Sequence, residues 1–254
     1  MSETRTLTAI TKDGEFFPRI ADLAMRVTNE LDSGDVSALL AEASDLCGAD
    51  AAAFASFVKD DEAYESYRFI LACDPTWCLE YESNACYMHD PWLEYTRHHS
   101  EATLAKHIPA RTAQQIEVVA LARRFGFASA IVVPAQSPQG LTRLGALCLG
   151  SAQPDYFDEQ TLTAVSVAVT GLVVRLHAWQ IATLRNELLT RTRLSNDDLA
   201  LLAQQREGRS SKEIASMTNS TSQGVDSRWQ RLNAKLGVSS RATAAQLAAE
   251  YGLI

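Results

Sequence analysis

The 254-residue chain lacks the features that mark several classes of protein. No apolar run approaches the roughly 20 residues needed to span a bilayer, and the first 13 residues are polar, without the apolar centre of a secretory signal. Five cysteines at irregular spacing form no disulfide framework, so reduced thiols fit better. We therefore expect a cytoplasmic protein that has no membrane partner.

Motifs for catalysis and metal binding are also missing. The sequence contains no G-x-S-x-G, P-loop or H-E-x-x-H motif, so an enzyme is only an alternative from a different class. Cys73, Cys78, Cys86 and His89 follow the spacing C-x4-C-x7-C-x2-H, which agrees poorly with the C-x2-4-C pairs of zinc sites. The sequence predicts no catalytic residue, no metal and no cofactor.

Charge is distributed unevenly along the chain. Residues 191–254 hold nine Lys/Arg against six Asp/Glu, a balance of +3, whereas residues 1–190 hold the other 14 and 25, a balance of −11. A small basic unit attached to an acidic body suggests a polyanionic partner for the smaller part.

Hydrophobic periodicity predicts an α+β arrangement in the first two thirds of the chain. A helix is expected from an N-cap at Asp35 to a stop at Gly48, and a second one over residues 111–126 with Ile116, Val119 and Ala120 on its inner face. Short β-branched or aromatic segments predict strands at 51–58, 65–73, 128–135 and 143–151. This order is typical of an α-β-α sandwich with an antiparallel sheet.

A long helix is predicted to start near Asp158. Its apolar residues recur three and four positions apart, which gives one continuous stripe made of Leu162, Val165, Val169, Leu172, Leu176 and Trp179. The stripe either packs on the sheet of its own domain or forms part of a homodimer interface. We place an N-terminal extension at 1–34, a sensor-like domain at 35–180, a polar linker at 181–193 and a last domain at 194–254.

The last domain contains four short helical patterns. Ser195 or Asn196 is expected to cap the first and Ser210 or Ser211 the second, with Met217 in its core. The third pattern ends at Leu236 and has Trp229 on its buried stripe. Two helices joined by a tight turn in a basic four-helix bundle predict a helix-turn-helix, whose second helix enters the major groove of DNA.

Three segments of this domain carry a family resemblance. "KEIA", "KLGVSSR" and the terminal "GLI" fall at the spacing of the DNA-binding domain of LuxR-type transcription regulators, which the domain resembles over its whole length. The resemblance implies that DNA is a partner. Groove-facing and phosphate-facing candidates are Arg209, Ser211, Lys212, Gln223, Asp226, Ser227, Arg228, Gln230 and Arg231.

The first domain carries a second resemblance. Trp77, Tyr81, Asp90 and Pro91 have the spacing W-x3-Y-x8-D-P, which is similar to the autoinducer-binding domain of quorum-sensing LuxR-type regulators. The resemblance implies a dimeric regulator that binds an acyl-homoserine lactone. Trp77 would donate to the lactone carbonyl, Tyr81 would line the pocket near the amide carbonyl, and Asp90 would accept the amide proton.

Several positions of this domain depart from the family pattern. Cys73 stands where ligand-binding members often carry Tyr, Ala105 stands where an indole is expected, and Ala130 replaces a usual Gly. Cys148 lies on the side expected to contact the acyl chain. A different lactone, an unrelated signal molecule, or a regulator that acts without ligand or through a protein partner therefore stay open as alternatives.

Overall fold

A computed structural model describes residues 6–59, 65–135, 137–138 and 140–254. The chain forms two compact units. The larger unit comprises residues 1–57, 67–137 and 144–179, and the smaller unit comprises residues 58–66, 138–143 and 180–254. Each unit is described separately below.

The larger unit is built on a five-stranded sheet. In chain order its strands are β1 (Ala51–Lys59), β2 (Glu65–Ala72), β3 (Thr103–Leu104), β4 (Ser129–Ala135) and β5 (Leu144–Ser151). They lie in the order β2-β1-β5-β4-β3, and the registered pairs β1 with β5, β5 with β4, and β4 with β3 are all antiparallel. The structure therefore confirms the predicted α+β class and its antiparallel sheet.

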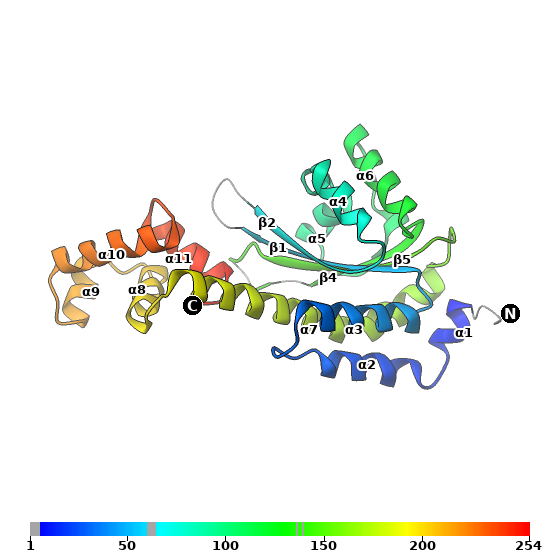
Figure 1. Ribbon diagram of the computed structural model, residues 1–254, viewed down its shortest axis with the longest axis horizontal. Helices are drawn as coiled ribbons and strands as arrows, with labels where there is room; N and C mark the ends of the chain where they lie inside the picture. The colour runs from blue at the N-terminus through cyan, green and yellow to red at the C-terminus, as the bar shows by residue number, and fades with distance from the viewer. Residues whose placement is uncertain (1–5, 60–64, 136, 139) are drawn as a thin grey trace. The chain divides into compact units, whose positions relative to one another are not determined.

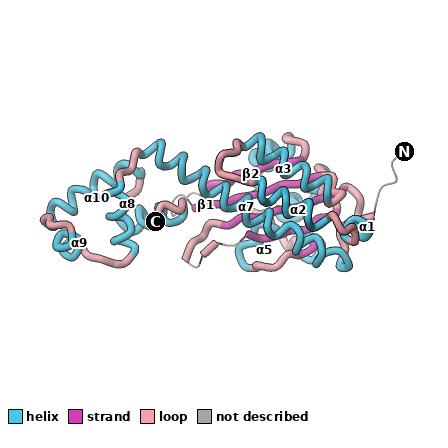
Figure 2. Tube along the Cα trace, turned by 90° about the horizontal axis from the view of Figure 1, so that it is seen from below, coloured by secondary structure: helices cyan, strands magenta, loops and turns pink. Residues whose placement is uncertain are grey.

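One face of the sheet is covered by α3 (Ser33–Leu46) and α7 (Glu159–Thr192), and α2 (Phe16–Arg26) packs on the side of these helices away from the sheet (Figure 1, Figure 2). The short α1 (Leu7–Thr11) precedes them. Buried sheet residues on this side are large, among them Phe54, Leu147 and Leu149. The predicted N-cap of α3 was wrong by three residues. Asp32 is the cap, because its side chain accepts the amide N–H of Asp35 while the Asp35 carboxylate accepts that of Asp32.

Helix α7 buries the predicted apolar stripe in this core. Val165, Val169, Leu172 and Leu176 are each 0% exposed, so packing within the unit is confirmed for this stripe. The helix continues to Thr192, so the predicted linker 181–193 is helical except for its last residue. By length and composition alone α7 could cross a membrane, a test that the core helix of a folded domain also passes.

The opposite face of the sheet carries α4 (Thr76–Ser83), α5 (Pro91–His98) and α6 (Ala113–Arg124), together with the 3-10 turns η1 (Cys86–Met88) and η2 (Ala105–His107) (Figure 1). The predicted inner face of α6 was wrong. Ile116 is 57% exposed, and Val118, Leu121 and Ala122 are buried instead. The capping box of Thr112 and Gln115 fixes where the helix begins.

The smaller unit contains α8 (Asn196–Arg206), α9 (Ser211–Met217), α10 (Ser222–Leu236) and α11 (Arg241–Glu250), as predicted. Ser195, Ser210, Thr221 and Ser240 cap them through their side-chain oxygens. Trp229 is 1% exposed and belongs to the core, as predicted, whereas Met217 is 56% exposed, which overturns its predicted core position. It is the last residue of α9, so no further turn covers it.

Candidate functional site

Tyr81 and Asp90 form a hydrogen-bonded pair on the face of the sheet that carries α4, α5 and α6. Tyr81 lies on α4 and donates its hydroxyl to Oδ2 of Asp90 at 2.8 Å. The other carboxylate oxygen caps α5, since Oδ1 accepts the amide N–H of Trp92 at 2.7 Å and that of Leu93 at 3.3 Å. Two carboxylate oxygens offer about four lone-pair sites, so Asp90 keeps the capacity to accept one further N–H.

The surroundings of this pair disfavour its negative charge. Although the Asp90 residue is only partly buried, burial of its carboxyl group raises the pKa, and the hydrogen bonds from Tyr81, Trp92 and Leu93 oppose that shift. The pKa of Tyr81 is raised well above its usual value by burial and by the adjacent Asp90 charge. Asp90 is therefore a carboxyl group held in place by three hydrogen bonds, none of which comes from a cationic side chain.

Trp77 lies beside this pair in a cluster of aromatic rings. Its ring centroid is 4.8 Å from that of Tyr81 and 5.4 Å from that of Phe69. The indole is 7% exposed, and its buried Nε1–H has no hydrogen-bond partner among the described residues. A buried donor without an acceptor costs about 1–3 kcal/mol, so an acceptor placed at this atom would recover that free energy.

The sheet offers a floor of small side chains to these helices. Residues paired across β1, β5 and β4 on this face form three rows: Ala51, Gly150 and Ala130; Ala53, Cys148 and Val132; Ala55, Ala146 and Pro134. Cys73 packs against both aromatic clusters above this floor. Burial, and secondarily the Asp90 charge, raise the pKa of the Cys148 thiol. The structure thus brings all six sequence-predicted ligand residues to one side of one sheet.

In the smaller unit, a short turn over residues 218–221 joins α9 to α10. Four candidates for nucleic-acid contact on these helices are exposed, namely Lys212, Gln223, Gln230 and Arg231, and Ser227 is partly exposed. Ser227 donates its hydroxyl to the carbonyl oxygen of Gln223 at 3.0 Å. These side chains present amide, hydroxyl and cationic groups, the types that contact base edges and phosphates.

Asp226 takes part in a polar network that links three helices. Its Oδ1 accepts the Ser211 hydroxyl at 2.7 Å and the Arg241 guanidinium at 2.6 Å, and Arg241 also donates to Ser211 at 2.6 Å. Hydrogen bonds from Ser211 and Arg241 lower the pKa of Asp226. Asp226 and Ser211 therefore connect the first turn of α9, the second turn of α10 and the first turn of α11.

Two further basic candidates have acidic neighbours. Arg209 lies 2.9 Å from the Glu207 carboxylate, and Arg228 donates to the carbonyl oxygen of Asp197 at 3.3 Å. Sequence reasoning missed Arg241, which is 30 residues from Ser211 and 15 from Asp226, and it missed Trp92 and Phe127, whose rings extend the aromatic wall from Trp77. Trp92 directly follows the Asp90–Pro91 motif, so its position in the sequence could have identified it as a candidate.

Comparison with known proteins gives a family match for the larger unit. A family model described as the autoinducer binding domain matches residues 32–178. No curated protein sequence matches the chain.

Two solved structures share the fold. A crystal structure of Escherichia coli SdiA has a TM-score of 0.71 at 16% identity, covering 94% of this chain and 99% of that chain. A structure of SdiA in complex with octanoyl-rac-glycerol has a TM-score of 0.69 at 15% identity, covering 95% of this chain and 98% of that chain. At these identities the similarity shows that this chain has the same fold as SdiA, and nothing further.

Proposed function

The chain belongs to the autoinducer-binding domain family, and we propose that it is a LuxR-type transcription regulator that binds a small signal molecule in its larger unit and DNA through α10. The signal is an acyl-homoserine lactone or a related amphiphile with an amide or ester group. The protein acts as a cytoplasmic homodimer, and the exposed residues Val167 and Val174 on α7 are candidates for the contact between its two copies.

The Tyr81–Asp90 pair is the observation that carries the ligand proposal. Asp90 has a lone pair left for an amide N–H, while Trp77 has an N–H left for a carbonyl oxygen. A ligand with a donor and an acceptor on adjacent groups would satisfy both. The apolar chain of such a ligand would lie over the floor of small residues, near Ala130, Cys148 and Cys73.

Ligand binding is tested by thermal shift and isothermal titration calorimetry with two probes, N-octanoyl-homoserine lactone and 1-octanoyl-rac-glycerol. The amide-containing lactone should raise the midpoint of unfolding, and Trp77→Ala should abolish that rise. Asp32→Asn, which alters an N-cap remote from the site, should leave binding unchanged. Binding of neither probe would favour the alternative, a regulator that acts without ligand or through a protein partner.

The DNA proposal is supported by the exposed polar face of α10. Gln223 and Gln230 carry amides that can pair with adenine, and Lys212 and Arg231 can contact phosphates. Arg209, Arg228, Ser227 and Ser211 flank this face. Asp226 would accept from a cytosine amino group only if it kept a free lone pair beside Ser211 and Arg241.

Gel-shift titration with duplexes selected from a random library tests this assignment. Affinity should fall steeply with salt because phosphate contacts release counterions. Gln223→Ala should relax sequence preference, whereas Lys212→Gln should weaken binding to all sequences and reduce the salt slope by about one. Salt-independent binding, or none, would contradict a DNA-reading role for α10.

A further inference from the structure

Residues 103–107, which we call the strap, form one wall of a cavity in the larger unit. The strap consists of β3 and η2, and it lines a cavity of about 370 Å³ together with the turn at 154–157. Ala130, one of the sequence-predicted ligand residues, lines the same cavity. The cavity is therefore part of the proposed ligand site, and the strap and the turn are two of its walls.

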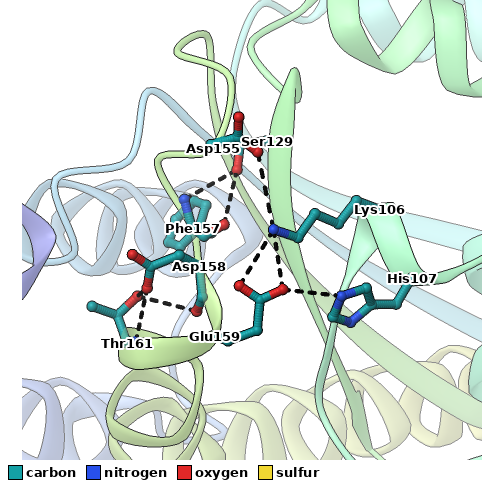
Figure 3. Close-up of polar contacts among 8 residues, drawn as sticks. All are labelled: Lys106, His107, Ser129, Asp155, Phe157, Asp158, Glu159 and Thr161. Carbon is teal, nitrogen blue, oxygen red and sulfur yellow. Dashed lines mark hydrogen bonds and ion pairs between the residues drawn. The ribbon is translucent and has the colours of Figure 1, made fainter.

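Ionic contacts join the strap to the opposite wall. Figure 3 shows Lys106 directed toward Glu159 and Asp155, whose carboxylate oxygens lie 3.2 Å and 4.0 Å from its ammonium nitrogen. The ring of His107 lies 3.2 Å from the same Glu159 carboxylate. A backbone amide, Lys106 and His107 lower the pKa of Glu159, so this carboxylate is charged at neutral pH. Lys106 and Asp155 both line the cavity and have 44% and 82% of their side chains exposed, so the contacts span the place where the cavity meets the solvent.

The carboxylate side of these contacts is firmly held. Glu159 is the first residue of α7. Asp158 caps this helix, since its Oδ1 accepts the amide N–H of Thr161 at 2.9 Å and the hydroxyl of Thr161 at 2.7 Å. Phe157 is 1% exposed and donates its amide N–H to Oγ of Ser129 at 3.0 Å. The turn and the start of α7 are therefore a fixed wall of the cavity.

The strap itself has fewer fixed contacts. β3 is two residues long and lies at the edge of the sheet, next to β4. Within residues 103–107, all of which the structure describes, only Leu104 is buried. Segments with few buried apolar contacts open locally at a low cost in free energy. The strap is therefore the wall that can move.

We propose that the strap is the gate of the ligand site and that Glu159 holds it closed through Lys106 and His107. The gate opens when both contacts with Glu159 separate while α7 and the turn stay in place. A ligand enters and leaves through the open form. This inference rests on the proposed function of the site, but opening of the strap is a property of the ligand-free chain and can be measured without a ligand.

Hydrogen exchange of the ligand-free full chain measures the opening. In Glu159→Gln the amides of the strap should exchange about three- to tenfold faster at low salt, a range that corresponds to two exposed ionic contacts. Sodium chloride at about 1 M should accelerate exchange of the native strap and have little effect on the variant, because salt screens exposed charges. The matched control Glu80→Gln breaks the ion pair with Arg124 between α4 and α6, and it should leave exchange of the strap unchanged.

A charge exchange identifies the contact between the two walls. Lys106→Glu should accelerate exchange of the strap at least as much as Glu159→Gln, because it places two carboxylates side by side. The double variant Lys106→Glu, Glu159→Lys should restore most of the slow exchange. Unchanged exchange in both single variants, or acceleration that extends equally over β4, would refute the proposal.

Stopped-flow binding of N-octanoyl-homoserine lactone, or of 1-octanoyl-rac-glycerol if the lactone does not bind, tests the role in ligand entry. In Glu159→Gln the association and dissociation rates should both rise by a similar factor, so that Kd changes less than about twofold. Unchanged rates in a variant whose strap exchanges faster would show that the strap is not the gate. If neither probe binds, the ligand proposal fails, whereas the opening of the strap is still decided by hydrogen exchange.

Discussion

Replacing Asp90 by Asn should separate ligand binding from stability. Asn is as good an N-cap as Asp, so it can keep the amide hydrogen bonds of Trp92 and Leu93 that Oδ1 accepts at 2.7 Å and 3.3 Å. The other carboxylate oxygen becomes an NH2 group, which donates to Tyr81 and cannot accept from a ligand amide. Hydrogen bonds to charged groups contribute about 1.5–3 kcal/mol, so lactone affinity should fall roughly ten- to hundredfold.

Stability should change in the opposite direction. Because burial raises the pKa of Asp90 in the folded protein, the folded state binds its proton more tightly than the unfolded state does. The contribution of Asp90 to stability is therefore complete below the unfolded pKa of about 3.9 and is lost as the pH rises through the raised folded value. The neutral amide of Asp90→Asn carries no such dependence, so the variant should be at least as stable as the native chain at neutral pH.

Urea unfolding followed by circular dichroism, from about pH 4 to about pH 8, measures this difference. The free energy of unfolding of Asp90→Asn minus that of the native chain should increase with pH over this range. Asp32→Asn, an N-cap replacement away from the site, should show no comparable trend in its difference. If Asp90→Asn lowered the free energy of unfolding by more than about 1 kcal/mol at neutral pH and left lactone affinity unchanged, Asp90 would serve only as the cap of α5.

Three further predictions concern the smaller unit. Asp226→Ala should raise affinity for duplex DNA and steepen the salt dependence by about one, because it removes a carboxylate and releases Arg241; an unchanged slope in gel-shift titration would place this network away from DNA. Glu250→Ala should lower the free energy of unfolding by about 3–5 kcal/mol in denaturant titration, because the fully buried carboxylate accepts the amide N–H groups of Thr142 and Arg143 at 2.8 Å and 2.9 Å. A near-zero effect would mean that water takes the place of the carboxylate. Gly224→Ala should stabilise the chain by less than about 1 kcal/mol, since the gain in helix propensity is offset by a new methyl group about 3.2 Å from the capping Thr221 hydroxyl; a loss would show that the crowding dominates.

The sequence predicted elements better than it predicted their faces. Along α6 apolar residues occupy adjacent positions, and both the stripe through Ile116 and Val119 and the one through Val118 and Leu121 fit a helical period. The sheet and α4 select the second stripe, which is tertiary information that periodicity does not contain.

Side-chain partners far apart in the chain were harder to predict. Asp226 was expected to face a DNA groove because its position on α10 is opposite the buried stripe. The network with Ser211 and Arg241 depends on how α9 and α11 pack beside α10.

The two faces of the sheet carry side chains of different size. Across β1, β5 and β4, five of the six residues in the rows Ala52, Leu149, Ile131 and Phe54, Leu147, Val133 are large apolar side chains, which fill the space against α3 and α7. The alternate residues of the same strands are almost all small, and in one row Gly150 is required because a Cβ there would lie 2.4 Å from the Phe127 ring.

Selection for stability alone would favour larger side chains on that second face, since each buried methylene adds about 0.8 kcal/mol. The small residues instead leave the space above the sheet to the rings of Trp77, Tyr81 and Phe127, and Tyr81 is hydrogen-bonded to Asp90, a carboxyl group whose charge is disfavoured by burial. Both features reduce stability, and both have a reason if a ligand supplies the missing apolar contacts and hydrogen bonds. The face that packs on α7 therefore stabilises the fold, and the small side chains of the opposite face leave the space that the proposed signal molecule would fill.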